Sequence, residues 1–210
     1  MDLSRLGFLR VGVCAPTVKI ADPEANTTTI LDVYKRLCER QAAVVVTPEL
    51  SLTGYSCEDL FHSDDLLARS REALARVAEA TDSVALVVGA PWRLVDGRLL
   101  NCAFVCASGR IVGAVPKTAH PNYDEFYEQR WFTSGANLLA TISGEAGHFQ
   151  IRADQLFAIH NTQFGIEICE DLWAPEPPST SHALAGASLI VNPSASNELV
   201  AKANYRHDLV

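Results

Sequence analysis

The sequence predicts a mixed α/β fold in which helices cover the outside of a mixed sheet. Two stretches near the N-terminus each join a helix to a short apolar strand, and two turn sequences further along bracket strands that should pair antiparallel. Apolar residues make up 48% of the 210 residues, enough for one domain with a sizeable core, and no internal repeat or linker divides the chain. We therefore expect one domain over residues 1–210.

The first of these units consists of a strand, a helix and a second strand. Residues 8–15 alternate in polarity enough to form a strand. Asp22-Pro23 then provides an N-cap and a proline for the first helical position, and the β-branched run Val44–Val46 predicts a buried strand that ends at Thr47-Pro48-Glu49. The apolar stripe of the intervening helix comprises Ile30, Val33, Tyr34, Leu37 and Cys38.

The second unit repeats this order. Ser63-Asp64-Asp65 is an acidic cap for a helix, which leads into a strand over residues 84–88. The inward-facing residues of this helix are Leu66, Leu67, Leu74 and Val77.

Two turn sequences follow, Asp96-Gly97 and Ser108-Gly109, and they bracket Leu99–Ala107. We expect this segment and residues 111–115 to be adjoining antiparallel strands, the second of which ends at Pro116-Lys117.

The second half of the chain begins with a long polar and aromatic loop, residues 120–135, whose length without clear periodicity suggests a function. After it we expect a hairpin, a short helix, a strand and the beginning of a last helix. These elements correspond to residues 156–159 with 164–168, 179–187, 189–191 and 204–210.

Composition limits the kinds of partner. The net charge of −8 and the lack of clustered Lys and Arg argue against nucleic acid or anionic lipid, so we expect a small ligand. Apolar runs are far shorter than the roughly 20 residues of a membrane helix, and the N-terminus does not resemble a signal peptide. We therefore expect a cytoplasmic protein with no membrane or nucleic-acid partner.

The cysteines and histidines show no metal-binding pattern. The six cysteines lack paired CxxC spacing and the density of a disulfide scaffold, so we expect mostly reduced, buried thiols. The six histidines lack HxxxH and HExxH spacing, which argues against a zinc hydrolase, and the sequence has no glycine-rich phosphate loop.

Three reactive side chains, Glu49, Lys117 and Cys169, follow the carboxyl ends of predicted strands, where α/β sheets place their sites. A deprotonated thiol is a strong nucleophile, a carboxylate can take its proton, and an ammonium can stabilise the oxyanion of a tetrahedral intermediate. Together they suggest acyl transfer through a thioester. A Cys–His protease would need a histidine that the fold brings to Cys169, and would leave the other two segments unexplained.

The setting of Cys169 distinguishes it from the other cysteines. An apolar strand stops at this thiol, and Glu170 and Asp171 follow directly. We expect these acids to raise the pKa of the thiol by repulsion, so a nucleophilic Cys169 needs Lys117 or a proton-accepting Glu49 to compensate.

The three segments resemble the Glu, Lys and Cys motifs of the nitrilase superfamily in order and spacing. They are Thr47–Tyr55 (TPELSLTGY), Pro116-Lys117 and Gly165–Asp171 (GIEICED). Other segments are similar to the amidase domain of the glutamine-dependent NAD synthetases. These are Ser56–Leu60 (SCEDL), Pro121-Asn122-Tyr123, Phe126-Tyr127-Glu128 and Asn192–Ser196 (NPSAS).

This resemblance implies an α-β-β-α sandwich and hydrolysis of the side-chain amide of L-glutamine to supply ammonia. In the family pattern Glu49 is the general base, Lys117 stabilises the oxyanion and Cys169 is the nucleophile. The family's additional structural glutamate falls on Glu128. No cofactor is implied for this reaction.

The same resemblance assigns the binding of glutamine to Tyr123, Glu170, Ser196 and Lys202. Packing of the loop is the alternative role for Tyr123 and Phe126. The sequence departs from the family pattern in two places. His120 stands where an apolar residue is expected, and residues 197–202 lack the usual glycine before the lysine.

The resemblance covers residues 8–210, and family members continue through the rest of the amidase domain into an ATP-binding synthetase domain. We therefore expect an incomplete amidase domain, either a fragment or a degenerate copy, with ATP and Mg used only in the synthetase domain. The partners implied are L-glutamine, that synthetase domain and, from the family's habit of pairing, a second copy of the chain.

Three functions remain open at this point. The first is the ammonia-supplying domain of the synthetase, and the second is a free-standing amidase or carbamoylase of the same superfamily. The third is a truncated, non-catalytic module that only associates with intact subunits. Turnover of glutamine against simple aliphatic amides separates the first two, and thioester chemistry separates both from the third.

Overall fold

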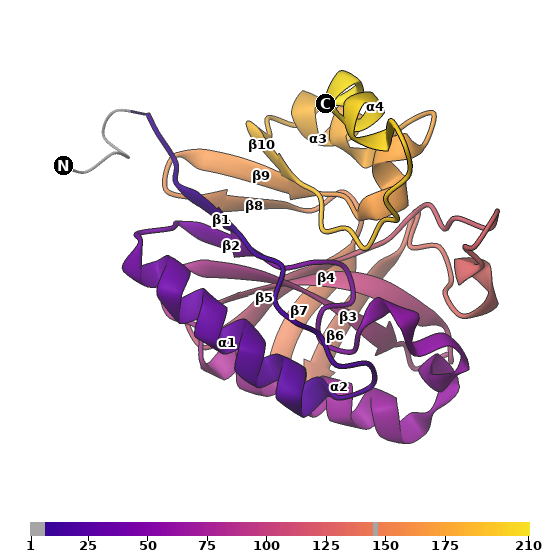
Figure 1. The fold of residues 1–210 in the computed structure, drawn as a ribbon. Coiled ribbons are helices and arrows are strands. Elements are labelled where there is room, and N and C mark those ends of the chain that lie inside the picture. The colour runs from indigo at the N-terminus through magenta and orange to yellow at the C-terminus, as the bar shows by residue number, and fades with distance from the viewer. Residues whose placement is uncertain (1–6, 145–146) are drawn as a thin grey trace.

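Two β-sheets lie face to face in the computed structural model, which describes residues 7–144 and 147–210 (Figure 1). The larger sheet has seven strands and the smaller has three. In spatial order the larger sheet contains β1 (Val11–Val13), β2 (Val44–Val46), β3 (Ala85–Arg93), β4 (Leu99–Ala107), β5 (Arg110–Pro116), β7 (Gly147–Arg152) and β6 (Leu139–Gly144). The smaller sheet contains β10 (Leu189–Val191), β9 (Thr162–Ile166) and β8 (Leu156–Ile159).

Helices cover the outer faces of the two sheets. The α-helices are α1 (Pro23–Glu39), α2 (Asp64–Glu79), α3 (Pro178–Leu184) and α4 (Lys202–Leu209). The 3-10 helices are η2 (Tyr55–His62), η3 (Glu128–Arg130) and η4 (Cys169–Trp173). Figure 1 shows α1 and α2 along the larger sheet and α3 over the smaller one. The predicted α-β-β-α sandwich is therefore confirmed.

The predicted N-caps of the first two helices are present. The Asp22 carboxylate accepts a hydrogen bond from the Ala25 N–H at 3.1 Å, and the Ser63 hydroxyl accepts one from the Leu66 N–H at 3.4 Å. Caps of this kind contribute about 1 kcal/mol, because they satisfy backbone donors that the helix itself leaves free. Local chemistry therefore sets where both helices begin.

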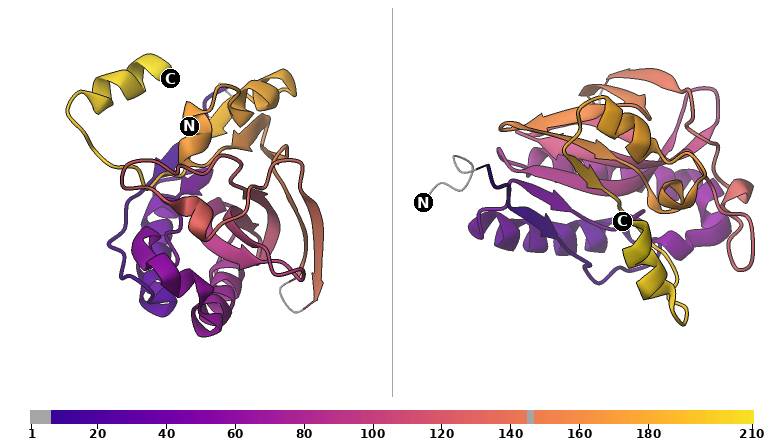
Figure 2. Two further views of the ribbon diagram at one scale, coloured as in Figure 1. Left: turned by 90° about the vertical axis from the view of Figure 1, so that its right-hand side faces the viewer. Right: turned by 90° about the horizontal axis from the view of Figure 1, so that it is seen from above.

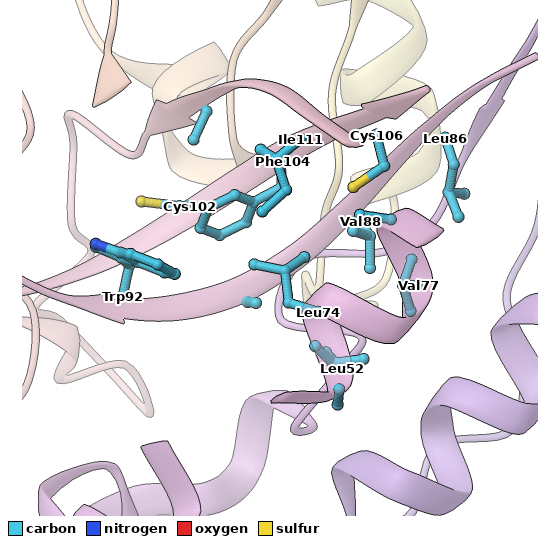
Figure 3. Close-up of a cluster of buried hydrophobic side chains, with 14 of the residues drawn as sticks. Leu52, Leu74, Val77, Leu86, Val88, Trp92, Cys102, Phe104, Cys106 and Ile111 are labelled. Atoms are coloured by element: carbon cyan, nitrogen blue, oxygen red, sulfur yellow. The ribbon is translucent and has the colours of Figure 1, made fainter. Parts of the chain in front are cut away.

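Separate apolar clusters fill the two sides of the larger sheet. Figure 3 shows Leu74 and Val77 of α2 packed toward β3 and β4 on the helix side. The other cluster lies between the sheets and includes Cys169. Because side chains alternate along a strand, Val45 belongs to the first cluster and Val46 to the second.

Most predicted strands agree with the structure to within one residue, and three need correction. The first strand covers only Val11–Val13, the residues that pair with β2. The strand predicted over residues 164–168 occupies Thr162–Ile166, where the chain pairs with β8 and β10. The strand predicted over residues 84–88 extends to Arg93, and the helix predicted over residues 179–187 spans Pro178–Leu184.

The hairpin formed by β6 and β7 was not predicted. It extends the larger sheet through the parallel pairing of β7 with β5, where Ile151 lies opposite Ala114. In the described part of this hairpin only Phe149 and Ile151 are buried. An edge hairpin with so few core residues has a weak hydrophobic pattern, which explains the omission.

The directions of the strands bring the candidate site residues together. β4 runs antiparallel to both β3 and β5, and β2 runs parallel to β3, so β2 and β5 point the same way. Glu49 follows β2 and Lys117 follows β5, so both lie beyond the same edge of the larger sheet. Cys169 follows β9 in the facing sheet.

The C-terminal segment is attached less firmly than the sandwich. Figure 2 shows α4 away from the two sheets, at the end of an extended stretch of chain. None of the α4 side chains is buried. Of the helices in the described residues, none combines the length and the hydropathy needed to span a membrane.

Candidate active site

Glu49 lies in a tight loop that is pressed against β3. Its neighbour Leu50 has a φ of +50°, and the loop backbone passes directly over Gly89. A Cβ atom on Gly89 would lie 2.3 Å from the Leu50 nitrogen, so only glycine allows this approach. The Glu49 Oε1 atom accepts a hydrogen bond from Asn101 Nδ2 at 2.7 Å, and Oε2 accepts one from the Ala195 N–H at 3.1 Å.

Lys117 connects Glu49 to a second carboxylate. Its Nζ atom lies 2.7 Å from Glu49 Oε1 and 2.7 Å from Glu128 Oε1, and none of the three side chains is more than 1% exposed. Burial alone would lower the pKa of Lys117, but the two carboxylates raise it to above its ordinary value. The site therefore contains a permanently charged ammonium.

Glu128 is held by further donors on its other sides. Tyr55 donates its hydroxyl proton to Oε1 at 2.7 Å, and His120 Nδ1 lies 3.0 Å from Oε2. Burial would raise the pKa of Glu128, but the hydrogen bonds from His120 and Lys117 outweigh it and lower the pKa. Glu128 is therefore a stable anion.

The two carboxylates that share Lys117 have opposite pKa shifts. Burial raises the pKa of Glu49, and the attraction of Lys117 offsets this only in part, whereas the pKa of Glu128 is lowered. A carboxylate with a raised pKa is the better proton acceptor near neutral pH. Environments that separate two carboxyl pKa values divide their roles, so Glu49 suits a general base and Glu128 a fixed counter-ion.

Cys169 begins η4 in a left-handed conformation with a φ of +48°, which is uncommon for a residue with a Cβ. Burial raises the pKa of its thiol to about 12; Glu49 adds to the rise and Lys117 opposes it. Both charges therefore act directly on this thiol. Because the thiol is neutral at pH 7, it needs a base at the moment of reaction.

Glu170 and Asp171, which follow Cys169, were expected to raise the pKa of its thiol, and this expectation was wrong. Burial and Glu49, not Glu170 and Asp171, are the largest causes of the raised thiol pKa. The Asp171 carboxylate instead ties the nucleophile segment to the chain after Lys117. Its donors are the N–H and hydroxyl of Thr118 and the N–H groups of Ala119 and Ile168.

The predicted glutamine-binding residues line one cavity with Cys169. The cavity has a volume of about 400 Å³, and Tyr123, Glu170, Ser196 and Lys202 are all in its wall. The Tyr123 hydroxyl lies 3.0 Å from each Glu170 carboxylate oxygen, and Lys202 Nζ lies 2.8 Å from Ser196 Oγ. A carboxylate and an ammonium therefore face the same space as the thiol.

Aromatic rings form much of the remaining wall. Phe126 lines the cavity and also makes edge-on contacts with Tyr55 and Tyr123, at centroid distances of 6.5 and 6.0 Å. The Lys202 ammonium lies 5.6 Å from the ring centroid of Trp173. The two roles considered for Tyr123 and Phe126, packing of the loop and lining of the site, therefore coexist.

Both departures from the family pattern have structural consequences. The His120 side chain is buried, contacts Glu128 and stacks on Phe132. Ala201 has a φ of +70°, a conformation that glycine adopts without strain. Lys202 nevertheless reaches the cavity.

Asn101, Tyr55 and Ala195 also belong to this site, although no role was predicted for them from the sequence. Asn101 is the only polar residue in the apolar strand Leu99–Ala107, and that isolation was the available signal. Ala195 contributes only its backbone N–H, which no residue type reveals.

A second cavity, of about 690 Å³, lies beside α3 and the β6 edge, and none of the three reactive side chains lines it. Over residues 7–144 and 147–210, no group of three or more His, Cys, Asp or Glu side chains could hold a metal ion. The chemistry of the lining, not the volume, therefore selects the smaller cavity as the candidate active site.

Comparison with known families places the chain among enzymes that hydrolyse carbon–nitrogen bonds. Residues 10–210 match the model of the carbon-nitrogen hydrolases, and the chain belongs to this family. The family predicted from the three sequence motifs is therefore confirmed.

The relatives within this class are more specific. The glutamine-dependent NAD(+) synthetase of Mycobacterium tuberculosis (strain ATCC 25618 / H37Rv) is 40% identical over 205 residues, which cover 95% of this chain and 30% of that protein. The crystal structure of a glutamine-dependent NAD(+) synthetase from Cytophaga hutchinsonii superposes with a TM-score of 0.85 at 30% identity, over 96% of this chain and 33% of that one. The chain thus spans about a third of the length of these relatives.

An amidase from Nesterenkonia sp. shares the fold. Its crystal structure gives a TM-score of 0.71 at 21% identity, over 93% of this chain and 68% of that one. The sandwich is therefore shared by proteins of quite different length.

Proposed function

We propose that this chain hydrolyses the side-chain amide of L-glutamine through a thioester on Cys169, and that the ammonia is used to amidate deamido-NAD. The observation that carries the proposal is the cavity in which Cys169 faces both Glu170 and Lys202. Such a pair of opposite charges suits the α-ammonium and α-carboxylate of a free amino acid. The identity of 40% to a glutamine-dependent NAD(+) synthetase supports the choice of glutamine.

In the first half of the reaction Glu49 accepts the Cys169 thiol proton while Sγ attacks the amide carbon. The carbonyl electron pair moves to the oxygen, and Lys117 stabilises the resulting oxyanion. When this intermediate collapses, the carbon–nitrogen bond breaks and the proton on Glu49 passes to the leaving nitrogen. The products of this half are ammonia and a glutamyl thioester.

In the second half a water molecule attacks the thioester and Glu49 accepts its proton. The carbon–sulfur bond breaks, the proton returns to Sγ and glutamate leaves. One base thus serves both halves, which agrees with the raised pKa of Glu49. Glu128 keeps Lys117 in place throughout and exchanges no proton.

Recognition of the amino-acid end is assigned to four residues of the cavity wall. Glu170, oriented by the Tyr123 hydroxyl, binds the α-ammonium group. Lys202, oriented by Ser196, binds the α-carboxylate. A simple aliphatic amide offers neither charge, so it is the poorer substrate.

The test is to measure ammonia release from glutamine and from butyramide by the purified chain, with Cys169→Ala as the inactive control. The proposal expects glutamine to be preferred by at least about tenfold in kcat/KM, or 1.4 kcal/mol. Equal turnover of both amides would favour the free-standing amidase or carbamoylase. A glutamine-like diazo-ketone should label Cys169 alone among the six cysteines, and no label even in a longer chain would favour the non-catalytic module.

The remaining proposals concern the partners. We propose that a synthetase domain, using ATP and Mg, consumes the ammonia, that the protein pairs with a second copy of itself, and that it acts in the cytoplasm. Supplied with ATP, deamido-NAD and free ammonia, this chain alone should make no NAD. Robust NAD synthesis by the purified chain would contradict the proposal that a synthetase domain consumes the ammonia.

A further inference from the structure

The His120 side chain is buried between Glu128 and Phe132. This side chain is 3% exposed, and Nδ1 lies 3.0 Å from Glu128 Oε2. The ring stacks on Phe132 at a centroid distance of 6.1 Å and an interplanar angle of 20°. The Nε2 atom is buried and has no hydrogen-bond partner in the described residues.

These contacts define one tautomer. The Glu128 carboxylate can only accept hydrogen bonds, so His120 Nδ1 must carry a proton to donate. A proton on Nε2 would be a buried donor without an acceptor, which is costly. These contacts therefore favour the tautomer of His120 that carries its proton on Nδ1.

His120 completes the set of donors around Glu128. Oε1 accepts from Lys117 and Tyr55, and Oε2 accepts from His120. Without His120, Oε2 would be a buried carboxylate oxygen with no donor in the described residues. The carboxylate would then rotate toward another donor or take up a proton, and in either case Lys117 would lose its second anchor.

We propose that His120 is a positioning residue for amide hydrolysis: its Nδ1–H group holds Glu128 as an oriented anion, and Glu128 in turn fixes Lys117 beside Glu49. The inference rests on the proposed glutaminase function. His120 does not line the cavity, so its influence falls on the chemical steps and not on glutamine binding.

The pKa of Glu128 agrees with this role. Burial is the largest influence on that pKa and raises it, and the hydrogen bond from His120 is the largest of the influences that lower it. Removing the donor therefore moves Glu128 toward its protonated form.

The kinetic test compares His120→Leu with His120→Asn. Leucine removes the donor, and kcat for glutamine should fall about tenfold with KM unchanged within about twofold. The asparagine amide nitrogen can occupy the place of Nδ1, so His120→Asn should restore kcat to within about threefold of the wild type. In a Glu128→Gln background, His120→Leu should cause no further loss, because the two residues act as one unit. Equal losses in the Leu and Asn variants, or a kcat unchanged by leucine, would overturn the proposal.

A second measurement needs neither catalysis nor a variant that folds. Side-chain ¹⁵N NMR of the wild-type chain should show His120 with a protonated Nδ1 and a bare Nε2. His182 provides the matched control, since its Nε2 lies 3.0 Å from the Ala153 carbonyl and its Nδ1 is buried without a partner in the described residues. It should show the opposite tautomer.

These two measurements keep the two proposals separable. A chain that shows the Nδ1–H tautomer of His120 but hydrolyses no glutamine would contradict the proposed function and leave His120 as the donor to Glu128. A protonated Nε2 on His120 would overturn the inference even in an active glutaminase.

Discussion

The two sides of the candidate active site are built in different ways. On one side Glu49, Lys117 and Glu128 are fully buried, and each carboxylate oxygen accepts at least one hydrogen bond. On the other side part of the cavity wall comes from residues 196–205, where α4 has no buried side chain and Val200 is fully exposed. The residues proposed for the reaction chemistry are therefore part of the core, whereas Ser196 and Lys202, two of the four residues proposed to bind glutamine, belong to a surface segment.

This difference predicts two classes of variant. A change in the buried cluster should reduce kcat and the free energy of unfolding together, because the same contacts serve catalysis and stability. A change in the C-terminal wall should raise KM and leave kcat and global stability almost unaffected. A substitution on one side that produced the effects expected of the other side would contradict this difference.

Lys117→Met should have the largest effect. It leaves Glu49 and Glu128 buried without their shared cation, which costs about 3–5 kcal/mol of folding free energy. It also removes the oxyanion partner, so kcat should fall by about 10²–10³. Urea unfolding and ammonia release measure the two effects, and Lys35→Met, an exposed change on α1, is the matched control. A stable, active Lys117→Met chain would contradict the assignment of Lys117.

Glu49→Gln should come next. The amide keeps the shape of the side chain but cannot accept the thiol proton, so kcat should fall by about 10²–10⁴. The fold should remain, with a lower free energy of unfolding, because the buried Lys117–Glu49 ion pair is lost. A general base is active when ionised, so activity is lost as the pH falls through its pKa. Because burial raises the pKa of Glu49, the wild-type acid limb should lie above the ordinary range for Glu, and it should vanish in the variant. The exposed change Glu39→Gln is the control. Activity of the Glu49→Gln variant within about threefold of the wild type would rule out Glu49 as the base.

Much of the buried side could be predicted from the sequence, and the reason is physical. Strand ends collect functional groups, so three separate strand-end residues, Glu49, Lys117 and Cys169, were sufficient to locate the cluster. Contacts between residues that are far apart in the sequence could not be predicted. The hydrogen bond from Asn101 to Glu49 joins residues 52 positions apart, and no local pattern encodes it.

Some parts of the fold could likewise be predicted from the sequence and others could not. Strands in the centre of a sheet, such as β2 and β4, carry continuous apolar runs, and their predicted bounds were correct. The edge hairpin of β6 and β7 was not predicted because it buries few side chains in the described residues. The thiol pKa was wrongly ascribed to neighbours in sequence, since burial and Glu49 are neighbours only in space.

Lys202→Met tests the exposed wall and should have a smaller effect. The ammonium lines the cavity, and its contacts in the described residues are the partly buried Ser196, Asn197 and face of Trp173. Its loss should raise KM for glutamine about tenfold, with kcat within about twofold and no change in the unfolding midpoint. Turnover of butyramide should be unaffected, because that amide has no carboxylate. A fall in kcat at constant KM would place Lys202 with the chemistry instead.

Ala201→Gly should have the smallest effect, and it is the one change expected to improve the protein. Ala201 lies at the start of α4 with a φ of +70° and a ψ of −3°, where a Cβ costs roughly 1 kcal/mol and glycine costs none. Glycine also makes the unfolded chain more flexible, so the net gain should be about 0.5 kcal/mol. Because Lys202 is the next residue, better ordering of α4 should lower KM for glutamine by about twofold and slow hydrogen exchange of the α4 amides. Ala203→Gly is the control: it lies inside α4, where glycine should destabilise the helix by about 1 kcal/mol and speed the same exchange. If both glycine variants speed exchange, the left-handed conformation of Ala201 does not reduce the stability of α4. The position of Lys202 must then depend on its contacts with Ser196 and Trp173.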